Sequence, residues 1–255
     1  MRLERHGCLF SQKTGQLRSV PVILCIWKNK TMTQDILRLL LDSFWKILLP
    51  GLTVTIPLTV LAFSIAMVIA IITAMVQYAN IPVLKQIARF YIWVIRGTPL
   101  LVQLYVVFFG LPSIGIKVAA FPSAVAVFAV NEGAYCAETM RAAIESVPSG
   151  QMEAGYCVGM NYIQIMRRIV LPQAFRTAFP PLFNSLIGMV KDTSLAANIT
   201  VAEMFFVTQR ISGRTYQFMA LYLELALIYL IFSTVLTRVQ AYGEKRLNSY
   251  GGNKI

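Results

Sequence analysis

Residues 47–76 read ILLPGLTVTIPLTVLAFSIAMVIAIITAMV, and this stretch decides the fold class. It is long, rich in Leu, Ile, Val and Thr, and contains no charged residue. Since the hydrocarbon core of a bilayer requires about 20 mainly apolar residues per helix, the stretch predicts a membrane-spanning helix. A second run has Glu224 as the only charge between Arg214 and Arg238. We therefore expect an all-α integral membrane protein.

The composition of the whole chain supports this class. Of its 255 residues, 57% are hydrophobic and 13% are charged, and the mean hydropathy is +0.64. A soluble domain of this length carries about a quarter charged residues. The net charge of +12 comes from cations at the ends of apolar segments, as in cytoplasmic loops of membrane proteins, so we do not expect nucleic-acid binding.

Several chemistries are absent from the sequence. The four cysteines show no CxxC spacing, and the one histidine is His6, which argues against a metal site or a Ser-His-Asp triad in the membrane body. Neither GxxxxGK[ST] nor GxGxxG occurs, so the chain lacks these phosphate-binding loops. We expect no cofactor in this chain and no enzymatic activity of its own.

The apolar segments predict about five transmembrane helices. They lie at about 47–76, 88–110, 119–145, 178–200 and 217–240. Charged residues interrupt the third and fourth segments, which is expected where helices face a pathway rather than lipid.

The cations predict the orientation through the positive-inside rule. With the N-terminus of the first span outside, the inside segments hold Lys85, Arg89, Arg141, Arg167, Arg168, Arg176, Arg238, Lys245, Arg246 and Lys254. The outside segments after Met32 hold Arg38, Lys46, Lys117, Arg210 and Arg214. This distribution predicts an external N-terminus and a cytoplasmic C-terminus.

Residues 1–31 differ from the rest of the chain. They form a basic extension, and Met32-Thr33-Gln34-Asp35 reads as a natural start. We expect residues 1–31 to result from an over-extended start assignment, residues 32–246 to form the transmembrane domain, and residues 247–255 to form a cytoplasmic tail.

The 148–174 segment, between the third and fourth spans, has a distinctive local pattern. It predicts a helix, a turn permitted by glycine, a second helix and a stop at Pro172. Asn161 can cap the second helix with Gln164 as its capping-box partner. One face of this helix is apolar, while Arg167 and Arg168 lie off it; the apolar residues are Ile165, Met166, Ile169 and Val170. Composition alone is typical of an interfacial helix lying on the membrane.

The spacing within this segment resembles the cytoplasmic loop of bacterial ABC-importer permeases. That loop reads Glu-Ala-Ala, three residues, Gly, nine residues and Ile-x-Leu-Pro. Here Glu153-Ala154-Gly155 is followed by three residues, Gly159, nine residues and Ile169-Val170-Leu171-Pro172. Gly155 replaces the second alanine, which costs up to about 1 kcal/mol of helix propensity. The resemblance implies that a coupling helix here docks into a groove on an ATP-binding subunit. The residues that it implies for this coupling are Glu153, Ala154, Gly155, Gly159, Ile169, Leu171 and Pro172.

Further stretches resemble the polar amino-acid branch of these permeases, including cystine permeases. They are Arg96-Gly97-Thr98-Pro99 continuing to Gln103, residues 133–138 followed by Arg141, and Lys191-Asp192-Thr193-Ser194-Leu195. The resemblance extends over about residues 33–246.

The resemblance also implies a location and partners. It implies a bacterial cell membrane, two ATP-binding subunits, an external binding protein that delivers the amino acid, and a second permease, identical or paralogous. Residues 202–214 and the segment near Lys46 are our candidates for contact with the binding protein.

Charges inside a bilayer must be paired or solvated. The candidate pathway residues are Arg96, Gln103, Glu132, Lys191, Asp192 and Glu224. Their alternative role is to join helices. We expect Glu138 to pair with Arg141, and we expect Lys191 and Asp192 to take part in ion pairs rather than to bind the substrate directly. Arg96 is either a clamp or a pathway residue. Glu132 lies about 240° around the helix from Glu138, and the family pattern does not require an acid there, so it is a candidate for substrate selection.

Two other classes of protein remain as alternatives. An ion-coupled secondary transporter also places acids at mid-membrane, often with repeat symmetry, but we find no internal repeat. A membrane-embedded enzyme would need a catalytic constellation that the sequence lacks.

Overall fold

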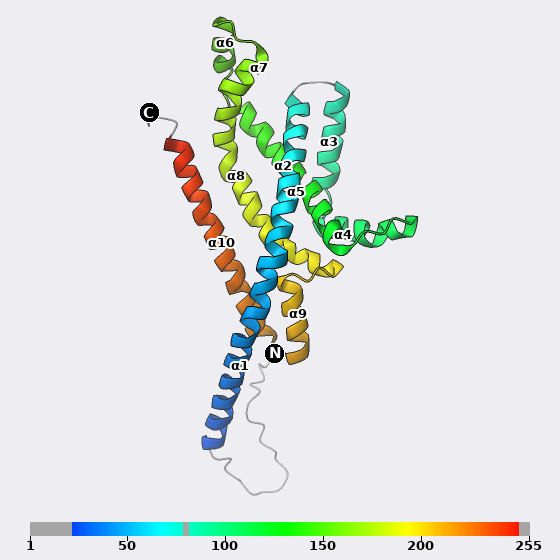
Figure 1. Ribbon diagram of the computed structural model, residues 1–255, viewed down its shortest axis with the longest axis vertical. Coiled ribbons are helices and arrows are strands. Elements are labelled where there is room, and N and C mark those ends of the chain that lie inside the picture. The colour runs from blue at the N-terminus through cyan, green and yellow to red at the C-terminus, as the bar shows by residue number, and fades with distance from the viewer. Residues whose placement is uncertain (1–21, 79–81, 250–255) are drawn as a thin grey trace, which may run out of the picture. The chain divides into compact units, whose positions relative to one another are not determined.

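The computed structural model describes residues 22–78 and 82–249, with side chains for 34–78 and 82–247, and all regular structure in these ranges is helical (Figure 1). The α-helices are α1 (Val22–Pro50), α2 (Ile56–Tyr78), α3 (Pro82–Arg96), α4 (Leu100–Tyr105), α5 (Ala120–Glu145), α6 (Ser149–Cys157), α7 (Tyr162–Ile165), α8 (Leu171–Asp192), α9 (Met204–Thr215) and α10 (Phe218–Ser249). Short π or 3₁₀ segments are η1 (Gly51–Thr55), η2 (Val106–Gly110), η3 (Leu111–Ile114), η4 (Met166–Val170) and η5 (Thr193–Ile199).

The chain divides into two units, residues 1–41 and 42–255, and every site discussed below lies in the second. The expectation for the basic extension concerns residues 1–31, of which 1–21 lie outside the described residues. The same holds for residues 250–255 of the expected tail.

Two helical stretches are long and apolar enough to cross a membrane, Gln34–Tyr78 and Phe218–Leu247. A third counts as one span only if Pro82–Arg96 and Leu100–Ile114 are taken together across a bend of 100°. The prediction of one span over 88–110 is therefore wrong in its bounds. The helix begins at Pro82 and ends at Arg96, because Pro99 takes an extended conformation (φ −63°, ψ 136°) that interrupts it.

The fourth predicted segment, 178–200, also requires correction. Helix α8 begins earlier, at Leu171, and ends at Asp192, after which η5 follows. Pro172 does not stop a helix, because it directly follows the π-helical turn η4, where the regular i→i−4 bonding is already replaced by the bond from the Leu171 N–H to the Met166 carbonyl. The helix before it passes into α8 through the π-helical turn η4. The third segment matches α5 closely, and the fifth matches the start of α10, which continues beyond residue 240 to Ser249.

Small residues bring α2 and α5 together. Ala62, Ala66, Ala70 and Ala74 recur every four residues along α2 and are buried. A Cβ at Gly133 of α5 would lie 2.9 Å from Cγ2 of Ile69, so the two backbones approach closely there. This is the packing expected of helices in a membrane, where small residues allow close approach. α8 packs on α5, and α10 packs on α8 and α9.

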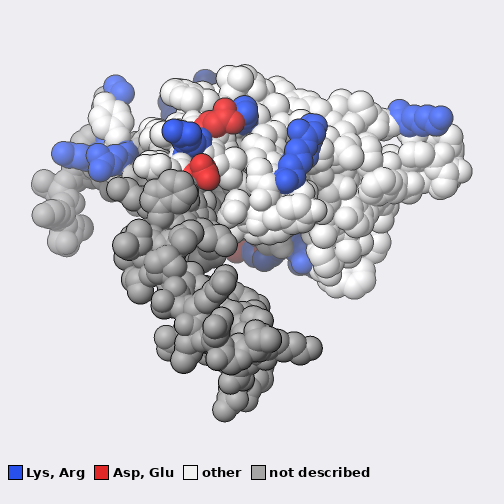
Figure 2. Space-filling view, turned by 90° about the horizontal axis from the view of Figure 1, so that it is seen from below, with Lys and Arg blue, Asp and Glu red and all other residues white. Residues whose placement is uncertain are grey.

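The outer surface of these helices is apolar. Exposed large side chains along α2 and α10 include Leu61, Ile65, Val68 and Ile72, then Leu223, Leu227, Leu230 and Ile231. Seen from below, at one end of the long axis of Figure 1, the described residues show their charged side chains in separate groups (Figure 2). The apolar surface along α2 and α10 matches a lipid environment.

Candidate functional site

Local backbone bonds fix the turn of the 148–174 segment. Gly159 has φ +80°, in the left-handed region that favours glycine. Its N–H donates to the carbonyl of Tyr156 at 2.9 Å, and the N–H of Met160 donates to the carbonyl of Gly155 at 3.0 Å. This pair of bonds is a Schellman motif, which ends α6 and reverses the chain. The predicted glycine turn is thus confirmed.

The predicted capping box is also present. Asn161 Oδ1 accepts from the N–H of Gln164 at 2.9 Å, and Gln164 Oε1 accepts from the N–H of Asn161 at 3.0 Å. Each bond satisfies a backbone donor at the start of α7 that has no partner within the helix. The second helix therefore begins where the sequence predicts.

The predicted apolar face of this second helix packs inward, against the helical body. Ile165, Met166 and Val170 are buried in a cluster with Ile144 of α5 and Ala174 of α8. Arg167 and Arg168 are exposed. The segment is therefore packed against the helical body rather than extended away from it.

The departure from the family pattern at Gly155 has a packing reason. Gly155 is buried, and a Cβ built on it would lie 2.7 Å from Cγ1 of Ile165. The sequence predicts only a loss of helix propensity at this position. The contact shows that Gly155 also brings α6 close to α7.

One side-chain contact joins this segment to α2, and two bonds of Gln173 lie within the segment. The Tyr78 hydroxyl at the end of α2 donates to Sδ of Met152 at 3.4 Å. Gln173 Nε2 of α8 donates to the carbonyl of Ile169 at 3.0 Å and to Oε1 of Gln151 at 3.5 Å. Partial burial, with Tyr78 and Tyr156 nearby, raises the pKa of Tyr162, so this hydroxyl remains protonated at neutral pH.

An exposed apolar surface lies at the turn of the segment. We call Tyr156, Val158 and Ile163 the apolar tip, and Val158 and Ile163 are 76% and 74% exposed. Glu153 and Ala154, two of the coupling residues that the resemblance implies, are exposed nearby, whereas a third, Ile169, is partly buried. Sequence reasoning did not single out the apolar tip. The sequence feature that indicates this tip is the presence of apolar residues on both sides of Gly159 that do not belong to the buried face of the second helix.

A second group of functional candidates lies along one face of α5. Asn131, Glu138 and Glu145 are seven residues apart, and Tyr135 and Arg141 fall on the same face. We call these five residues the polar track. Glu138 lies at its centre and forms ion pairs with Arg141 at 3.2 Å and with Arg96 at 3.7 Å. The predicted Glu138–Arg141 pair is thus confirmed.

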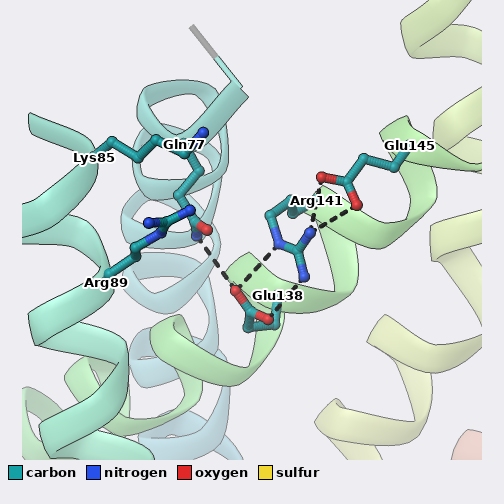
Figure 3. Close-up of a pocket in the computed structure, with 6 residues that line it drawn as sticks. All are labelled: Gln77, Lys85, Arg89, Glu138, Arg141 and Glu145. Carbon is teal, nitrogen blue, oxygen red and sulfur yellow. Dashed lines mark hydrogen bonds and ion pairs between the residues drawn. The ribbon is translucent and has the colours of Figure 1, made fainter. Parts of the chain in front are cut away.

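Other contacts extend the polar track toward α2 and along α5. Gln77 Nε2 donates to Glu138 Oε1 at 3.4 Å (Figure 3). Arg141 also binds both carboxylate oxygens of Glu145, at 2.8 and 2.7 Å. The track is therefore a linked network rather than a row of independent charges.

Arg96 acts as a clamp between α3 and α5. Besides its pairing with Glu138, its guanidinium lies 5.0 Å from the ring centroid of Tyr135. This is cation–π distance. The sequence left two roles open for Arg96, a clamp or a pathway residue, and these contacts are those of a clamp. The side chain remains 42% exposed.

Gln103 holds the bend between α3 and α4. Its Nε2 donates to the carbonyls of Ile95 at 2.8 Å and Thr98 at 3.2 Å, and to Oγ1 of Thr98 at 2.8 Å. Its Oε1 accepts from Asn131 Nδ2 at 3.1 Å. These bonds supply partners for backbone groups that the bend at Pro99 leaves free.

Glu132 points away from the polar track, as its helical position predicts. It accepts from Cys136 Sγ at 3.6 Å and lies near Ser185 and Asp192 of α8. Lys191 and Asp192 are both exposed, and no ion pair joins them in the part of the chain that the structure describes. Neither residue takes part in any other ion pair among the described residues, so the expected ion-pair role has no counterpart there.

Glu224 lies apart from these residues. It is buried in α10, and its Oε2 accepts from the Ser43 hydroxyl at 2.5 Å. The contact joins α10 to the C-terminal part of α1, so the structure places Glu224 in a helix–helix contact.

Comparisons with known proteins agree with this architecture. Residues 66–249 match the family described as "Binding-protein-dependent transport system inner membrane component". The chain is 46% identical over 210 residues to the L-cystine transport system permease protein TcyB of Bacillus subtilis (strain 168), covering 82% of this chain and 90% of that protein. It is 40% identical over 205 residues to the probable amino-acid ABC transporter permease protein PatM of Vibrio harveyi, covering 79% and 92%.

Solved structures show the same fold. The structure titled "Crystal structure of an amino acid ABC transporter with histidines" matches with a TM-score of 0.76 and 33% identity, over 81% of this chain and 96% of that chain. An inward-facing methionine ABC transporter, MetNI, matches with a TM-score of 0.69 at 17% identity, over 81% and 98%, which shows a shared fold. The chain belongs to the family of inner membrane components of binding-protein-dependent transport systems, and it is a multi-pass transport protein of the bacterial inner membrane.

Proposed function

We propose that this chain is the permease subunit of an ATP-driven importer of polar amino acids, with cystine as the first candidate substrate. A separate ATP-binding subunit would supply the energy. The observation that carries the proposal is the 148–174 segment, which is fixed to the helical body and presents an exposed apolar tip. The similarity to a cystine permease at 46% identity supports the substrate.

The apolar tip fits a docking role. Apolar residues at the centre of a contact and polar residues at its rim are typical of protein interfaces. Here Val158 and Ile163 would enter a groove on the ATP-binding subunit, with Glu153 at the rim. Because Ile165 and Val170 anchor the segment, movement of that subunit would be transmitted to α5 and α8.

The proposed topology has five spans, formed by α2, α3, α5, α8 and α10, with the N-terminus outside and the C-terminus in the cytoplasm. Lys85, Arg89, Arg141, Arg167 and Arg168 would then be cytoplasmic, in agreement with the positive-inside rule. In Figure 1, α6 and α7 lie at one end of these helices and α9 at the other. α9 would face the external binding protein.

The proposed pathway lies along the open side of α8. Lys191 and Asp192 are exposed there, and a Cβ at Gly188 would meet nothing within 4 Å. A second permease copy would close this side. An amino acid carries an ammonium and a carboxylate, so Glu132 and Asp192 would attract the ammonium, and Lys191 the carboxylate. Gln103, Arg96 and Glu224 would support the helices around the path.

The decisive experiment starts with the intact complex from native membranes, reconstituted with its binding protein. We expect an ATPase subunit to co-purify, and we expect cystine to stimulate ATP hydrolysis. Ile163→Ser should reduce both ATPase retention and stimulation at least about tenfold, the scale of a buried interface anchor. The matched control is Ile114→Ser, because Ile114 is 70% exposed but lies outside the 148–174 segment.

The alternative is an ion-coupled secondary transporter. If no ATPase subunit co-purifies and the purified permease moves substrate along an ion gradient, the proposal is wrong. Equal ATPase retention by the Ile163→Ser and Ile114→Ser variants would contradict docking through the apolar tip.

A further inference from the structure

A cavity of about 350 Å³ opens where the ends of three helices meet (Figure 3). Its lining is entirely polar: Gln77 of α2, Lys85 and Arg89 of α3, and Glu138, Arg141 and Glu145 of α5. Gln77, Lys85 and Glu145 lie near the ends of their helices that are closest to the 148–174 segment, and Arg89, Glu138 and Arg141 lie one to two turns further in. The cavity therefore lies at the same end of the helical body as that segment.

The cavity has an excess of positive charge toward α3. Both of its carboxylates, Glu138 and Glu145, already bind Arg141. No ion pair joins Arg89 to any residue that the structure describes. Arg89 therefore offers planar donors that suit the oxygens of a phosphate, with the ammonium of Lys85 one turn away.

Further along α3, the face that carries Lys85 and Arg89 becomes aromatic. Lys85, Arg89 and Trp93 are spaced at i, i+4 and i+8, so they share one face, and each step is about 6 Å along the axis. Trp93 is 72% exposed, and its ring lies 6.0 Å from that of Phe90, which is also exposed. Cations at a helix end followed by exposed tryptophan are typical of the boundary between headgroups and acyl chains.

We propose that this cavity binds the phosphate headgroup of an anionic phospholipid, with Arg89 and Lys85 holding the phosphate and Trp93 and Phe90 contacting the acyl chains. The proposal rests on the proposed function only in placing this end of the helices at the cytoplasmic leaflet, where anionic headgroups attract basic groups. Because Gln77 adjoins Tyr78, which contacts Met152, the bound lipid would lie beside the anchor of the 148–174 segment.

The test uses the intact transporter complex in nanodiscs that contain phosphatidylcholine and phosphatidylglycerol. After exchange into detergent, native mass spectrometry counts the retained lipids. We expect the wild type to retain phosphatidylglycerol over phosphatidylcholine, and the Lys85→Gln/Arg89→Gln variant to retain about tenfold less phosphatidylglycerol. Arg238→Gln is the matched control, since it removes an exposed cation of α10 outside the cavity and should leave retention unchanged.

Three further arms complete the test. The charge-conserving variant Lys85→Arg/Arg89→Lys should retain phosphatidylglycerol, which separates lost binding from misfolding. Millimolar inorganic phosphate should not displace the lipid; displacement would show a site for free phosphate and overturn the lipid assignment. Equal retention by the wild type and the Gln variant would also overturn it. Cystine-stimulated ATPase activity, measured on the same samples, reports separately on the proposed function.

Discussion

The 148–174 segment and the polar track of α5 are held together in different ways. In the 148–174 segment the defining bonds join near neighbours in sequence, such as Gly159 with Tyr156 and Asn161 with Gln164. In the polar track they also join separate helices, as in Gln77 with Glu138 and Arg96 with Glu138. Local bonds depend on residue types at fixed spacing, whereas the second kind depends on how the helices pack. The two regions should therefore respond differently to substitution.

The largest effect should follow from Gly159→Val. A β-branched residue at φ +80° costs about 1–2 kcal/mol or more and opens the turn between α6 and α7. We expect loss of amino-acid-stimulated ATPase activity and a melting temperature lower by at least about 2–4 °C, measured on the reconstituted complex. Gly150→Ala is the control, because Gly150 is helical with open space around it. Equal loss in both variants would mean that the turn is not the cause.

Gly155→Ala sharpens the comparison, because it restores the family pattern at a position where packing opposes it. The new Cβ would lie 2.7 Å from Ile165 Cγ1, so overpacking of about 1–3 kcal/mol should exceed the gain of about 1 kcal/mol in helix propensity. We expect a lower melting temperature for Gly155→Ala alone. In an Ile165→Ala background, the same change should raise the melting temperature. Stabilisation in both backgrounds would exclude the packing explanation.

Glu138→Gln tests the polar track. It removes the shared partner of Arg96 and Arg141. The free energy of unfolding should fall by about 1 kcal/mol, since solvent weakens charge-assisted hydrogen bonds between partly exposed groups. Glu145→Gln is the control, because Glu145 is exposed and contacts one residue of its own helix; its cost should be at most about 0.5 kcal/mol. Thermal unfolding in detergent measures both. A larger effect at Glu145 would show that Glu138 is not the centre of the network.

The smallest effect should come from Asn161→Ala, which removes one half of the capping box. The expected loss is about 0.5–1 kcal/mol, and Asn161→Asp should recover most of it, because aspartate caps equally well. Differential scanning fluorimetry of the three proteins measures the change. If Asn161→Asp melts no higher than Asn161→Ala, the cap does not stabilise this helix.

The sequence predicted the local features of the 148–174 segment in detail. The glycine turn, the capping box and the apolar face of the second helix each need only residues a few positions apart, and all three are present. The one wrong expectation was the stop at Pro172. A missing N–H disrupts regular α-helical bonding, but here the π-helical turn η4 precedes Pro172, and the sequence does not show that turn.

The sequence was less informative about the bend and the charges. Arg96-Gly97-Thr98-Pro99 marked an unusual stretch, but Gln103 as the side chain that holds the bend emerged only when Ile95, Thr98 and Asn131 were placed around it. The sequence predicts ion pairs for Lys191 and Asp192, but none is present among the described residues, because the partners of a charge depend on which helices pack beside it.

Sequence by itself determined that this protein is a helical membrane transport component and identified the loop through which we propose it is driven. The membrane class rests on apolar length and charge placement, and the transport role and the loop rest on the resemblance of the residue spacing to ABC-importer permeases. Only the tertiary structure decided that Glu138 joins three helices, that Gly155 packs on Ile165, and that Arg89 lies at a polar cavity. The reason is physical: a partner tens of residues away is chosen by helix packing, and a single sequence does not specify that packing directly.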